Sequence, residues 1–314
     1  MFSSVSRLPQ SPQAAWHKVD QLTFQTIQPR RNAPSGDCVT FGANNPQPIN
    51  QLKLQLGDDV VWDDNHRLQP TPNLVKNIAD VYFDQRAEAP GYLVITNILD
   101  FLGKPEEIRA FQKDLFEAAW KLIHQTTFSD TPIHSFLIRA VPMSDGQRVQ
   151  PDGFAFQDTY KSEKRPHMDT NIIFLAHSYG PLKDIEGGDL QVTRYPQLLK
   201  EKNLSAADLF GVSLNNHKLG PFIKPEWISQ LKEYTQTVSS KGWPIIFMNN
   251  RHVVHSVTPV VKTGEQPVRE FFRTSVQPPE TQPYFWETWL PDSAKPVELV
   301  MLRQAQAEIK SAKL

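Results

Sequence analysis

Three residues of the chain have the types and the order that a mononuclear iron site needs. His167 and Asp169 form a His-x-Asp pair, and His255 follows much later in the chain. Two histidines and one carboxylate bind Fe(II) on one face and leave the opposite positions open for a cosubstrate and O₂. Residues two apart on a strand point to the same face, so a strand through 167–169 would direct both side chains at one ion. His255 is then expected from a strand that is adjacent in space.

Further side chains are candidates for contacts around such an ion. Tyr160 and Thr170 lie near the pair in sequence and are candidates to hydrogen-bond a cosubstrate, a metal ligand or the substrate. Arg139 is a candidate substrate contact, although an ordinary structural role is favoured for it. His252 lies three residues before His255, and this odd spacing turns it the other way on a strand. We expect His252 in a loop or in a position that supports the ligands.

Composition narrows both the metal chemistry and the setting. The single cysteine, Cys38, excludes an intramolecular disulfide framework and cysteine-rich metal sites, so a metal must use histidine and carboxylate ligands. His177 and His217 have no carboxylate at ligand spacing, and we expect them to be structural or exposed. A formal net charge of −1 provides no positive electrostatic field that would attract nucleic acid. No apolar run approaches the roughly 18 residues that span a bilayer.

The expected setting is therefore a soluble protein of a reducing compartment. We predict a cytoplasmic location. The first nineteen residues contain no acid, which leaves an organellar transit peptide open.

The elements that would position these residues follow from sequence periodicity. Short apolar and β-branched runs predict strands at 52–56, 91–98, 135–141, 170–176, 188–192, 244–248, 255–261 and 268–276. Apolar residues at three- and four-residue steps predict helices at 105–123, 225–238 and 297–309. A further helix is expected to begin at Thr71-Pro72, with apolar residues on one face from Leu74 to Tyr82. Residues 28–50 are rich in Pro, Asn, Gln and Gly and predict an irregular arm.

Four pieces of the sequence, taken in order, resemble a known family. They are Gly91-Tyr-Leu-Val-Ile-Thr-Asn97; His167-Met-Asp-Thr-Asn-Ile-Ile-Phe-Leu-Ala176 with Glu186-Gly-Gly-Asp-Leu-Gln-Val192; Gly242-Trp-Pro-Ile-Ile-Phe-Met-Asn-Asn250; and His255-Ser-Val-Thr-Pro-Val260 with Arg269. On these pieces the chain resembles the Fe(II)/2-oxoglutarate-dependent oxygenase superfamily, and in particular its isopenicillin-N-synthase-like branch. The resemblance spans about 91–279. It implies a fold that is mostly β with flanking helices (α+β), built on a double-stranded β-helix (jelly-roll) core that holds one iron.

The resemblance also suggests how the chain is divided. Residues 1–90 would form an N-terminal arm and a helical or irregular region that packs on the core. Residues 91–280 would form the oxygenase core, and 281–314 a C-terminal helix. A helical insertion at about 195–240 makes the gap between the ligand strands longer than the branch usually shows. That insertion would supply a lid, a substrate wall or a dimer contact, and we expect all parts in one structural domain.

The family's cosubstrate, 2-oxoglutarate, needs a cation for its distal carboxylate, and arginine offers a bidentate fork. The branch's Arg-x-Ser motif appears here as Arg269-Glu-Phe271, without the serine, whereas Arg273-Thr-Ser275 spells the motif four residues later. On a regular strand both arginines face one side. We favour Arg269 as the anchor. Arg273 would then bind a cosubstrate or substrate carboxylate, or pair with an acid, and a surface ion pair is the alternative for either residue.

The activity that the resemblance implies is a dioxygenase reaction. Fe(II), 2-oxoglutarate and O₂ would oxidise a C–H bond of a small molecule by hydroxylation, desaturation or ring closure, with release of succinate and CO₂. His167, Asp169 and His255 would be the catalytic metal ligands, and the carboxylate of Asp169 argues against halogenation.

Alternatives remain open for the activity. One is an Fe(II) oxidase of the same fold that uses no 2-oxoglutarate, and another is a non-catalytic jelly-roll binding protein. A zinc hydrolase is disfavoured, because the sequence lacks a helical His-Glu-x-x-His arrangement. The expected partner is a small molecule, such as an amino acid derivative or a specialised metabolite, and neither nucleic acid nor membrane. The sequence predicts no oligomeric state.

Overall fold

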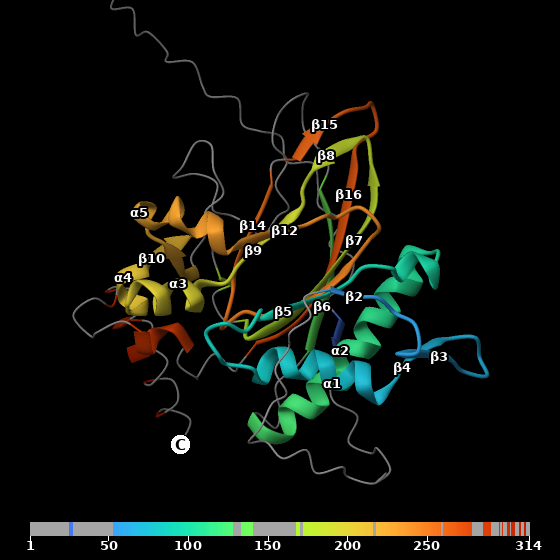
Figure 1. Ribbon diagram of the computed structural model, residues 1–314, viewed down its shortest axis with the longest axis horizontal. Coiled ribbons are helices and arrows are strands. Elements are labelled where there is room, and N and C mark those ends of the chain that lie inside the picture. Colours follow the sequence, from blue (N-terminus) through green and yellow to red (C-terminus); the bar gives the residue numbers. More distant parts are fainter. Residues whose placement is uncertain are drawn as a thin grey trace, which may run out of the picture.

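The computed structural model describes residues 25–27, 53–127, 133–140, 168–169, 172–215, 218–258, 260–277 and 285–289, and single positions between 295 and 311. Two antiparallel β-sheets lie at its centre, with helices around them, so the class is mostly β with flanking helices, as predicted (Figure 1). Within this part of the chain, the helices fall short of the length and apolarity that a bilayer crossing requires.

The larger sheet has seven strands. Their order is β1 (Gln25–Ile27), β6 (Ile133–Ala140), β16 (Val268–Val276), β7 (Phe174–Lys183), β13 (Ile245–Asn249), β5 (Tyr92–Ile95) and β2 (Lys53–Leu54). Every neighbouring pair is antiparallel except β2 and β5. The last strand along the chain, β16, is therefore inserted between β6 and β7 and is hydrogen-bonded on both sides.

The smaller sheet has three described strands. Their order is β12 (Thr235–Val238), β9 (Leu190–Thr193) and β14 (Val254–Val257), all antiparallel. The short strands β8 (Ile185–Gly187) and β15 (Val260–Lys262) pair beyond it. The chain passes between the two sheets from β7 to β9, from β12 to β13, from β13 to β14 and from β14 to β16.

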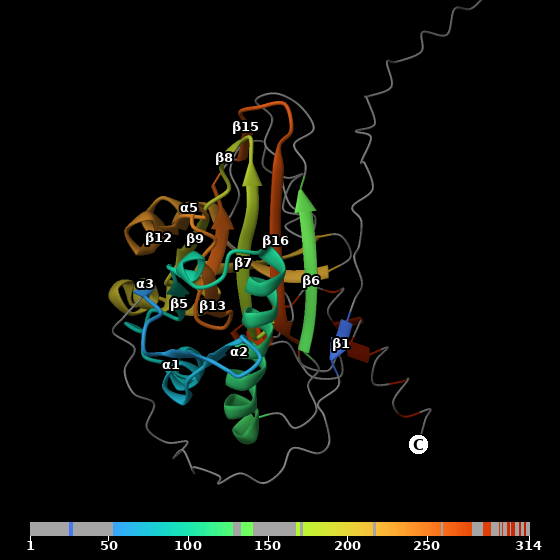
Figure 2. The ribbon, with the colours of Figure 1, turned by 90° about the vertical axis from the view of Figure 1, so that its right-hand side faces the viewer.

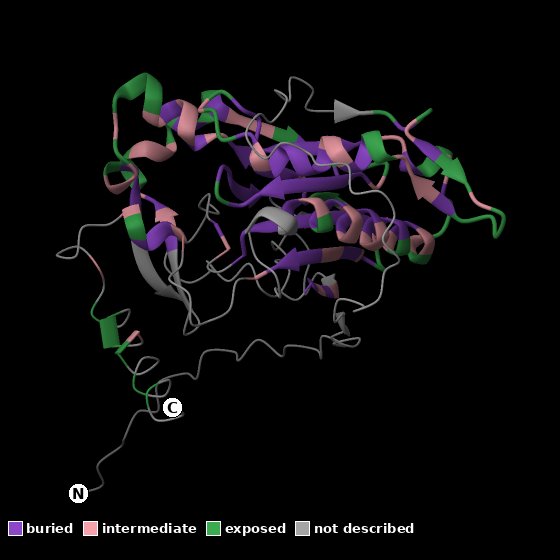
Figure 3. Cartoon of the chain, turned by 90° about the horizontal axis from the view of Figure 1, so that it is seen from below, coloured by how far each residue is buried: buried purple, intermediate pink, exposed green. Residues whose placement is uncertain are grey.

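The larger sheet separates two hydrophobic cores, and the period-2 alternation of its strands decides which residue enters which core. On β7, Phe174 and Ala176 belong to the outer core, whereas Leu175 and Tyr179 belong to the inner core, which lies between the sheets. The outer core is closed by helices α1 (Pro72–Phe83) and α2 (Pro105–Thr127). Figure 2 shows α2 along β7 and β16, and most residues of the sheet strands are buried (Figure 3).

The two long helices begin where the sequence predicts. Thr71 caps α1, because its side-chain oxygen accepts a hydrogen bond from the Leu74 amide at 3.4 Å, and Pro72 occupies the first turn. Glu106 and Glu107 lie in the first turn of α2, where the helix dipole favours acids. The prediction of α2 ended four residues early, at 123 instead of Thr127.

The insertion is mixed in structure. It contains α3 (Tyr195–Lys202), α4 (Ala206–Leu209), the hairpin β10 (Phe210–Asn215) and β11 (Lys218–Ile223), α5 (Pro225–Ile228) and the 3₁₀ helix η2 (Gln230–Tyr234). The predicted helix at 225–238 is wrong in its last four residues. These form β12, because Thr235, Thr237 and Val238 favour a strand and pair with β9.

Three predicted strands have different bounds. The strand predicted at 170–176 begins at Phe174 and runs to Lys183, and Met168 and Asp169 lie outside any strand. The strand predicted at 255–261 is divided into β14 and β15, with Pro259 in the sequence between them. The strand at 91–98 is shorter, since Ile98 opens the 3₁₀ helix η1 (Ile98–Asp100). The strand at 268–276 is confirmed in full.

Several remaining predictions fall on the chain ends. The strand predicted at 52–56 is reduced to β2, and the hairpin β3 (Val60–Trp62) and β4 (Leu68–Pro70) was not predicted. A 3₁₀ helix, η3, spans Phe285–Trp289. The described positions of the predicted C-terminal helix at 297–309 are helical. The arm predicted at 28–50 lies outside the described residues.

Candidate metal centre

Asp169 and His255 come together at the inner face of the larger sheet. The His255 Nε2 atom lies 3.8 Å from Asp169 Oδ2, and their side chains are 0% and 13% exposed. His255 belongs to β14 of the smaller sheet, where it pairs with Val192. Asp169 lies just before β7 of the larger sheet. A carboxylate and an imidazole from distant parts of the sequence therefore share one buried place.

The third predicted ligand cannot be placed beside them. His167, Tyr160 and Thr170 lie outside the described residues. Among the residues that are described, no group of three His, Cys, Asp or Glu side chains gathers in a metal-binding arrangement.

Asn250 fixes the backbone that carries Asp169. Its Nδ2 donates to the carbonyl oxygens of Asp169 at 2.8 Å and of Ile172 at 2.6 Å, and its Oδ1 accepts from the Asp169 amide at 3.3 Å. Asn250 is fully buried. It stands in the turn between β13 and β14, five residues before His255. Sequence patterns alone did not single out this residue, since a buried Asn in a turn has no distinctive spacing.

Arg273 pairs with the candidate ligand Asp169. Its Nη1 lies 3.4 Å from both carboxylate oxygens of Asp169, and its guanidinium carbon lies 4.3 Å from the centre of the Phe136 ring. Burial lowers the pKa of Arg273, and the Asp169 carboxylate acts in the opposite direction. Of the roles that the sequence left open for Arg273, pairing with an acid is the one present here.

Arg269 is enclosed more completely. It is 1% exposed, its Nη2 donates to the carbonyl oxygen of Gly188 at 2.8 Å, and its guanidinium carbon lies 5.3 Å from the centre of the Tyr179 ring. Gly187 and Gly188 have φ of 75° and 77°, a backbone region that favours glycine, and this turn presents the carbonyl. Burial lowers the pKa of Arg269, opposed by Tyr179 and Asp189.

Two nitrogen atoms of Arg269 are unpaired within the part of the chain that the structure describes. Its Nε and Nη1 are buried and have no hydrogen-bond partner among the described residues. A buried cation with unused donors is costly unless an anion meets it. Arg269 is therefore suited to hold a carboxylate.

His177 is a buried member of the same neighbourhood. It is 0% exposed on β7, and its ring centre lies 6.2 Å from that of His255 and 5.1 Å from that of Phe271. Burial holds the pKa of His177 well below its ordinary value, with Arg273 and His255 adding to the effect. We expected His177 to be either structural or exposed, and the structure shows that it is buried. Strand alternation with Leu175 and Tyr179 was the signal that could have placed it.

His255 has the protonation state that a metal ligand needs. Burial lowers its pKa below the ordinary value, Asp169 opposes this, and Arg273 reinforces it. The imidazole is therefore neutral near pH 7, and neutral imidazole is the form that binds metals.

Two further residues singled out in the sequence are His252 and Arg139. His252 is buried in the turn before β14, against Gly91, where an added Cβ would come within 2.8 Å of its ring. This agrees with the loop position expected for it. Arg139 lies on β6 opposite Glu270 of β16, and its side chain lies outside the described residues.

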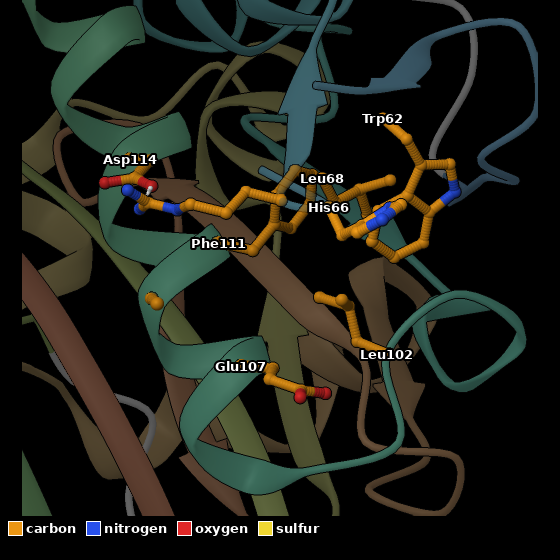
Figure 4. Close-up of a pocket in the computed structure, with 9 residues that line it drawn as sticks. Trp62, His66, Leu68, Leu102, Glu107, Phe111 and Asp114 are labelled. Atoms are coloured by element: carbon orange, nitrogen blue, oxygen red, sulfur yellow. Dashed lines mark hydrogen bonds and ion pairs between the residues drawn. The ribbon is translucent and has the colours of Figure 1, made fainter. Parts of the chain in front are cut away.

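A separate pocket of about 320 Å³ lies on the far side of α2. Glu107, Phe111 and Asp114 form its helical wall, with Trp62 and Leu68 from the β3–β4 hairpin opposite (Figure 4). The residues of α2 that contact the sheet, such as Gln112 and Phe116, occupy the other face of the helix. The pocket shares no residue with the candidate metal centre.

The chain matches no protein-family profile and no curated protein. Solved structures include partial likenesses. A bsmA homolog from Methylobium petroleophilum is 14% identical over 55% of this chain and 53% of its own, with a TM-score of 0.29. A taurine dioxygenase from Burkholderia xenovorans is 14% identical over 73% and 89%, with a TM-score of 0.38. The non-heme iron oxygenase OrfP, in complex with Fe, is 12% identical over 66% and 79%, with a TM-score of 0.33.

The chain thus spans about half the length of the first of these structures. Because each of these TM-scores lies below 0.5, the likenesses carry no argument about fold or activity.

Proposed function

We propose that the protein is a non-haem Fe(II)/2-oxoglutarate-dependent oxygenase that oxidises a C–H bond of a small molecule. The observation that carries this proposal is the convergence of Asp169 and His255 beside two buried arginines, Arg269 and Arg273. A carboxylate and a neutral imidazole supply metal ligands, and the free donors of a buried arginine supply a place for the anionic cosubstrate.

The strand order supports a jelly-roll core for this site. In such a core two antiparallel sheets face one another, and the chain alternates between them. Here β6, β16, β7 and β13 are consecutive in the larger sheet, and β12, β9 and β14 form the smaller one. Of the candidate ligands, Asp169 and His255 lie at the space between these two sheets.

His167, Asp169 and His255 would hold the iron. Two ligand atoms that each lie about 2 Å from one ion can be at most about 4 Å apart. The 3.8 Å between His255 Nε2 and Asp169 Oδ2 is within this limit. When bound, Fe(II) with 2-oxoglutarate and O₂ would supply the oxidising power, and succinate and CO₂ would be released.

We assign the cosubstrate carboxylate to Arg269 and not to Arg273. Arg273 already faces the Asp169 carboxylate, whereas Arg269 keeps two buried donors without a partner among the described residues. Arg273, at the edge of the same space, would orient Asp169 or meet a carboxylate of the substrate.

The insertion would form one wall of the substrate site. Its hydrophobic cluster, which contains Tyr195, Leu198, Phe210 and Leu231, also contains Met168 and Val254. These two residues are direct neighbours in sequence of Asp169 and His255. We propose that the substrate is a small molecule, such as an amino acid derivative or a specialised metabolite, and that the protein acts in the cytoplasm.

Anaerobic addition of Fe(II) and 2-oxoglutarate tests the proposal. The expected result is the weak visible charge-transfer band of an iron–2-oxoglutarate complex, which Arg269→Ala should abolish at moderate cosubstrate concentration. Iron binding without the band would favour an oxidase of the same fold that uses no 2-oxoglutarate. Absence of iron binding would overturn the oxygenase and leave a non-catalytic binding protein.

A further inference from the structure

We propose that Asn250 is a positioning residue that locks the Asp169 segment to the turn before His255, so that the two metal ligands are held as one unit. The inference rests on the proposed function, because it concerns the carboxylate and the imidazole that would bind iron. Asn250 itself does not touch the ion.

Three hydrogen bonds engage both ends of the Asn250 side chain. An amide side chain has two N–H donors and one carbonyl acceptor, and here both kinds serve the same short segment. Nδ2 donates to the carbonyl oxygens of Asp169 and Ile172, and Oδ1 accepts from the Asp169 amide. The Asn250 main-chain amide adds a bond to the Ile173 carbonyl oxygen at 3.2 Å. One residue thus contacts both polar backbone groups of Asp169.

The Asp169 segment depends on these bonds because it has no strand ladder of its own there. β7 begins only at Phe174, so the backbone at 169 is not aligned by neighbouring strands. Fixing the amide and the carbonyl of one residue fixes the direction of its Cα–Cβ bond. The direction of the Asp169 carboxylate is therefore set by Asn250, with Arg273 acting on the carboxylate itself.

The same turn is anchored to the ligand on the other side. Two main-chain amides, those of His252 and Val253, donate to the Asn249 carbonyl oxygen, and β14 follows at once with His255 paired to β9. Asn250 therefore connects the coil that carries one ligand to the turn that leads into the other. This connection therefore helps to set the distance between the Asp169 carboxylate and the His255 imidazole.

The neighbouring residue supplies a matched control. Asn249 is also 0% exposed and is the last residue of β13, directly before this turn. Its Nδ2 donates to the carbonyl oxygens of Tyr82 at 3.1 Å and Val81 at 3.4 Å, at the end of α1, and its Oδ1 accepts from the Arg251 amide at 3.1 Å. Replacing Asn249 removes the same kind of buried bonds but none to Asp169.

The experiment compares Asn250→Ala, Asn250→Asp and Asn249→Ala in the full-length chain. Two quantities are measured for each: the urea midpoint of the metal-free protein, and the anaerobic affinity for Fe(II) and for Co(II), with the Co(II) absorption spectrum recorded. Loss of a group that orients a ligand typically weakens metal binding by about 10- to 100-fold. We expect this loss, with a changed Co(II) spectrum, in both Asn250 variants.

Asn250→Asp keeps the size of the side chain and an acceptor for the Asp169 amide but removes both donors. It is therefore the variant to use where Asn250→Ala fails to fold. Asn249→Ala should lower the urea midpoint comparably and leave metal affinity within about threefold of wild type, because its side-chain donors bond to α1 and none of its side-chain bonds reaches Asp169.

Equal losses of metal affinity in the Asn249 and Asn250 variants would overturn the inference, because Asn250 would then act only through stability. Unchanged affinity in the Asn250 variants would overturn it as well. Failure of the wild-type protein to bind Fe(II) or Co(II) is a different result: it would overturn the proposed function first, and the inference with it.

Discussion

Arg269 and Arg273 place two guanidinium groups along the inner side of β16, and their surroundings differ. Arg273 lies beside the Asp169 carboxylate, so its charge is balanced within the site. Arg269 has a carbonyl oxygen and an aromatic face as its direct neighbours, and the Asp189 carboxylate also favours its charge. Together they balance the buried cation only in part. A dianionic cosubstrate would complete the balance, and this difference assigns separate roles to two residues of the same type.

Removal of the Arg269 guanidinium should therefore weaken 2-oxoglutarate binding strongly. Truncating one partner of a buried charge pair costs about 2–5 kcal/mol, so Arg269→Ala should lower the cosubstrate affinity by at least about 30-fold. Anaerobic titration of the iron-loaded protein with 2-oxoglutarate measures this. Arg269→Lys keeps the charge without the fork and should lie between; an Arg269→Ala protein with wild-type affinity would contradict the assignment.

Replacing the candidate carboxylate ligand should abolish turnover. Asp169→Asn preserves the shape of the side chain, and therefore its fit beside Asn250 and Arg273, but removes the negative charge that binds the ion. We expect no detectable succinate release and at least about tenfold weaker Fe(II) binding. Succinate production at the wild-type rate would exclude Asp169 as a ligand.

At the scale of elements, the two faces of the larger sheet have different roles: one packs against helices, and the other carries the candidate site. Helices α1 and α2 pack on the outer face, and the candidate ligands and arginines lie on the inner face. Phe116 of α2 stacks on Phe174 and Phe247, with ring centres 5.3 and 6.4 Å apart. The chemistry is thus separated from these contacts by the thickness of one sheet.

Phe116→Ala should consequently lower stability with little effect on the site. Removing a fully buried phenylalanine costs about 3–5 kcal/mol, and urea denaturation should show a loss of this size. The affinity of the folded variant for Fe(II) should stay within about threefold of wild type. A tenfold loss of metal affinity would indicate instead that α2 positions the inner face.

How far the sequence predicts these elements depends on how local the signal is. β16 is predicted with its correct bounds because β-branched and aromatic residues recur from Val268 to Val276 and stop shortly before Pro278. The start of α1 is predicted because a cap and a proline mark it. The bounds at 170–176 and 235–238 are wrong, because tertiary pairing with β16 and β9 overrides the local pattern.

The same contrast between local signals and tertiary contacts applies to the candidate site. Residue type and order in the sequence identify Asp169 and His255 as candidate ligands, and the structure brings the two together. The contacts of Asn250 and the burial of His177 depend on which segments meet in space. A single sequence contains no signal for such meetings between residues 80 or so apart, as for Asp169 and Asn250.

At the scale of the whole molecule, buried neutral histidines link stability to pH. The pKa values of His177, His252 and His255 are lowered, in each case chiefly by burial. In the unfolded chain these groups have a pKa of about 6.5. Below that pH the unfolded chain binds protons that the folded protein does not, so stability is full above about pH 6.5 and is lost as the pH falls toward the folded-state values.

The metal-free protein should therefore lose stability between pH 7 and pH 5.5. Each such histidine contributes at most about 1.4 kcal/mol per pH unit to the slope. Urea midpoints measured across this range should fall, and His252→Gln should flatten the dependence. A pH-independent midpoint, or a slope unchanged in the variant, would contradict the linkage.

The position of β16 has a consequence for how the protein is made. This strand is the last of the larger sheet to leave the ribosome, yet it lies between β6 and β7 and pairs with both. Until it is synthesised, the nascent chain has two unpaired strand edges facing each other, a state prone to aggregation. Closure of the sheet must therefore wait until β16 has been synthesised. Chaperone binding during translation, and sensitivity to C-terminal truncation, are the expected marks of this late step.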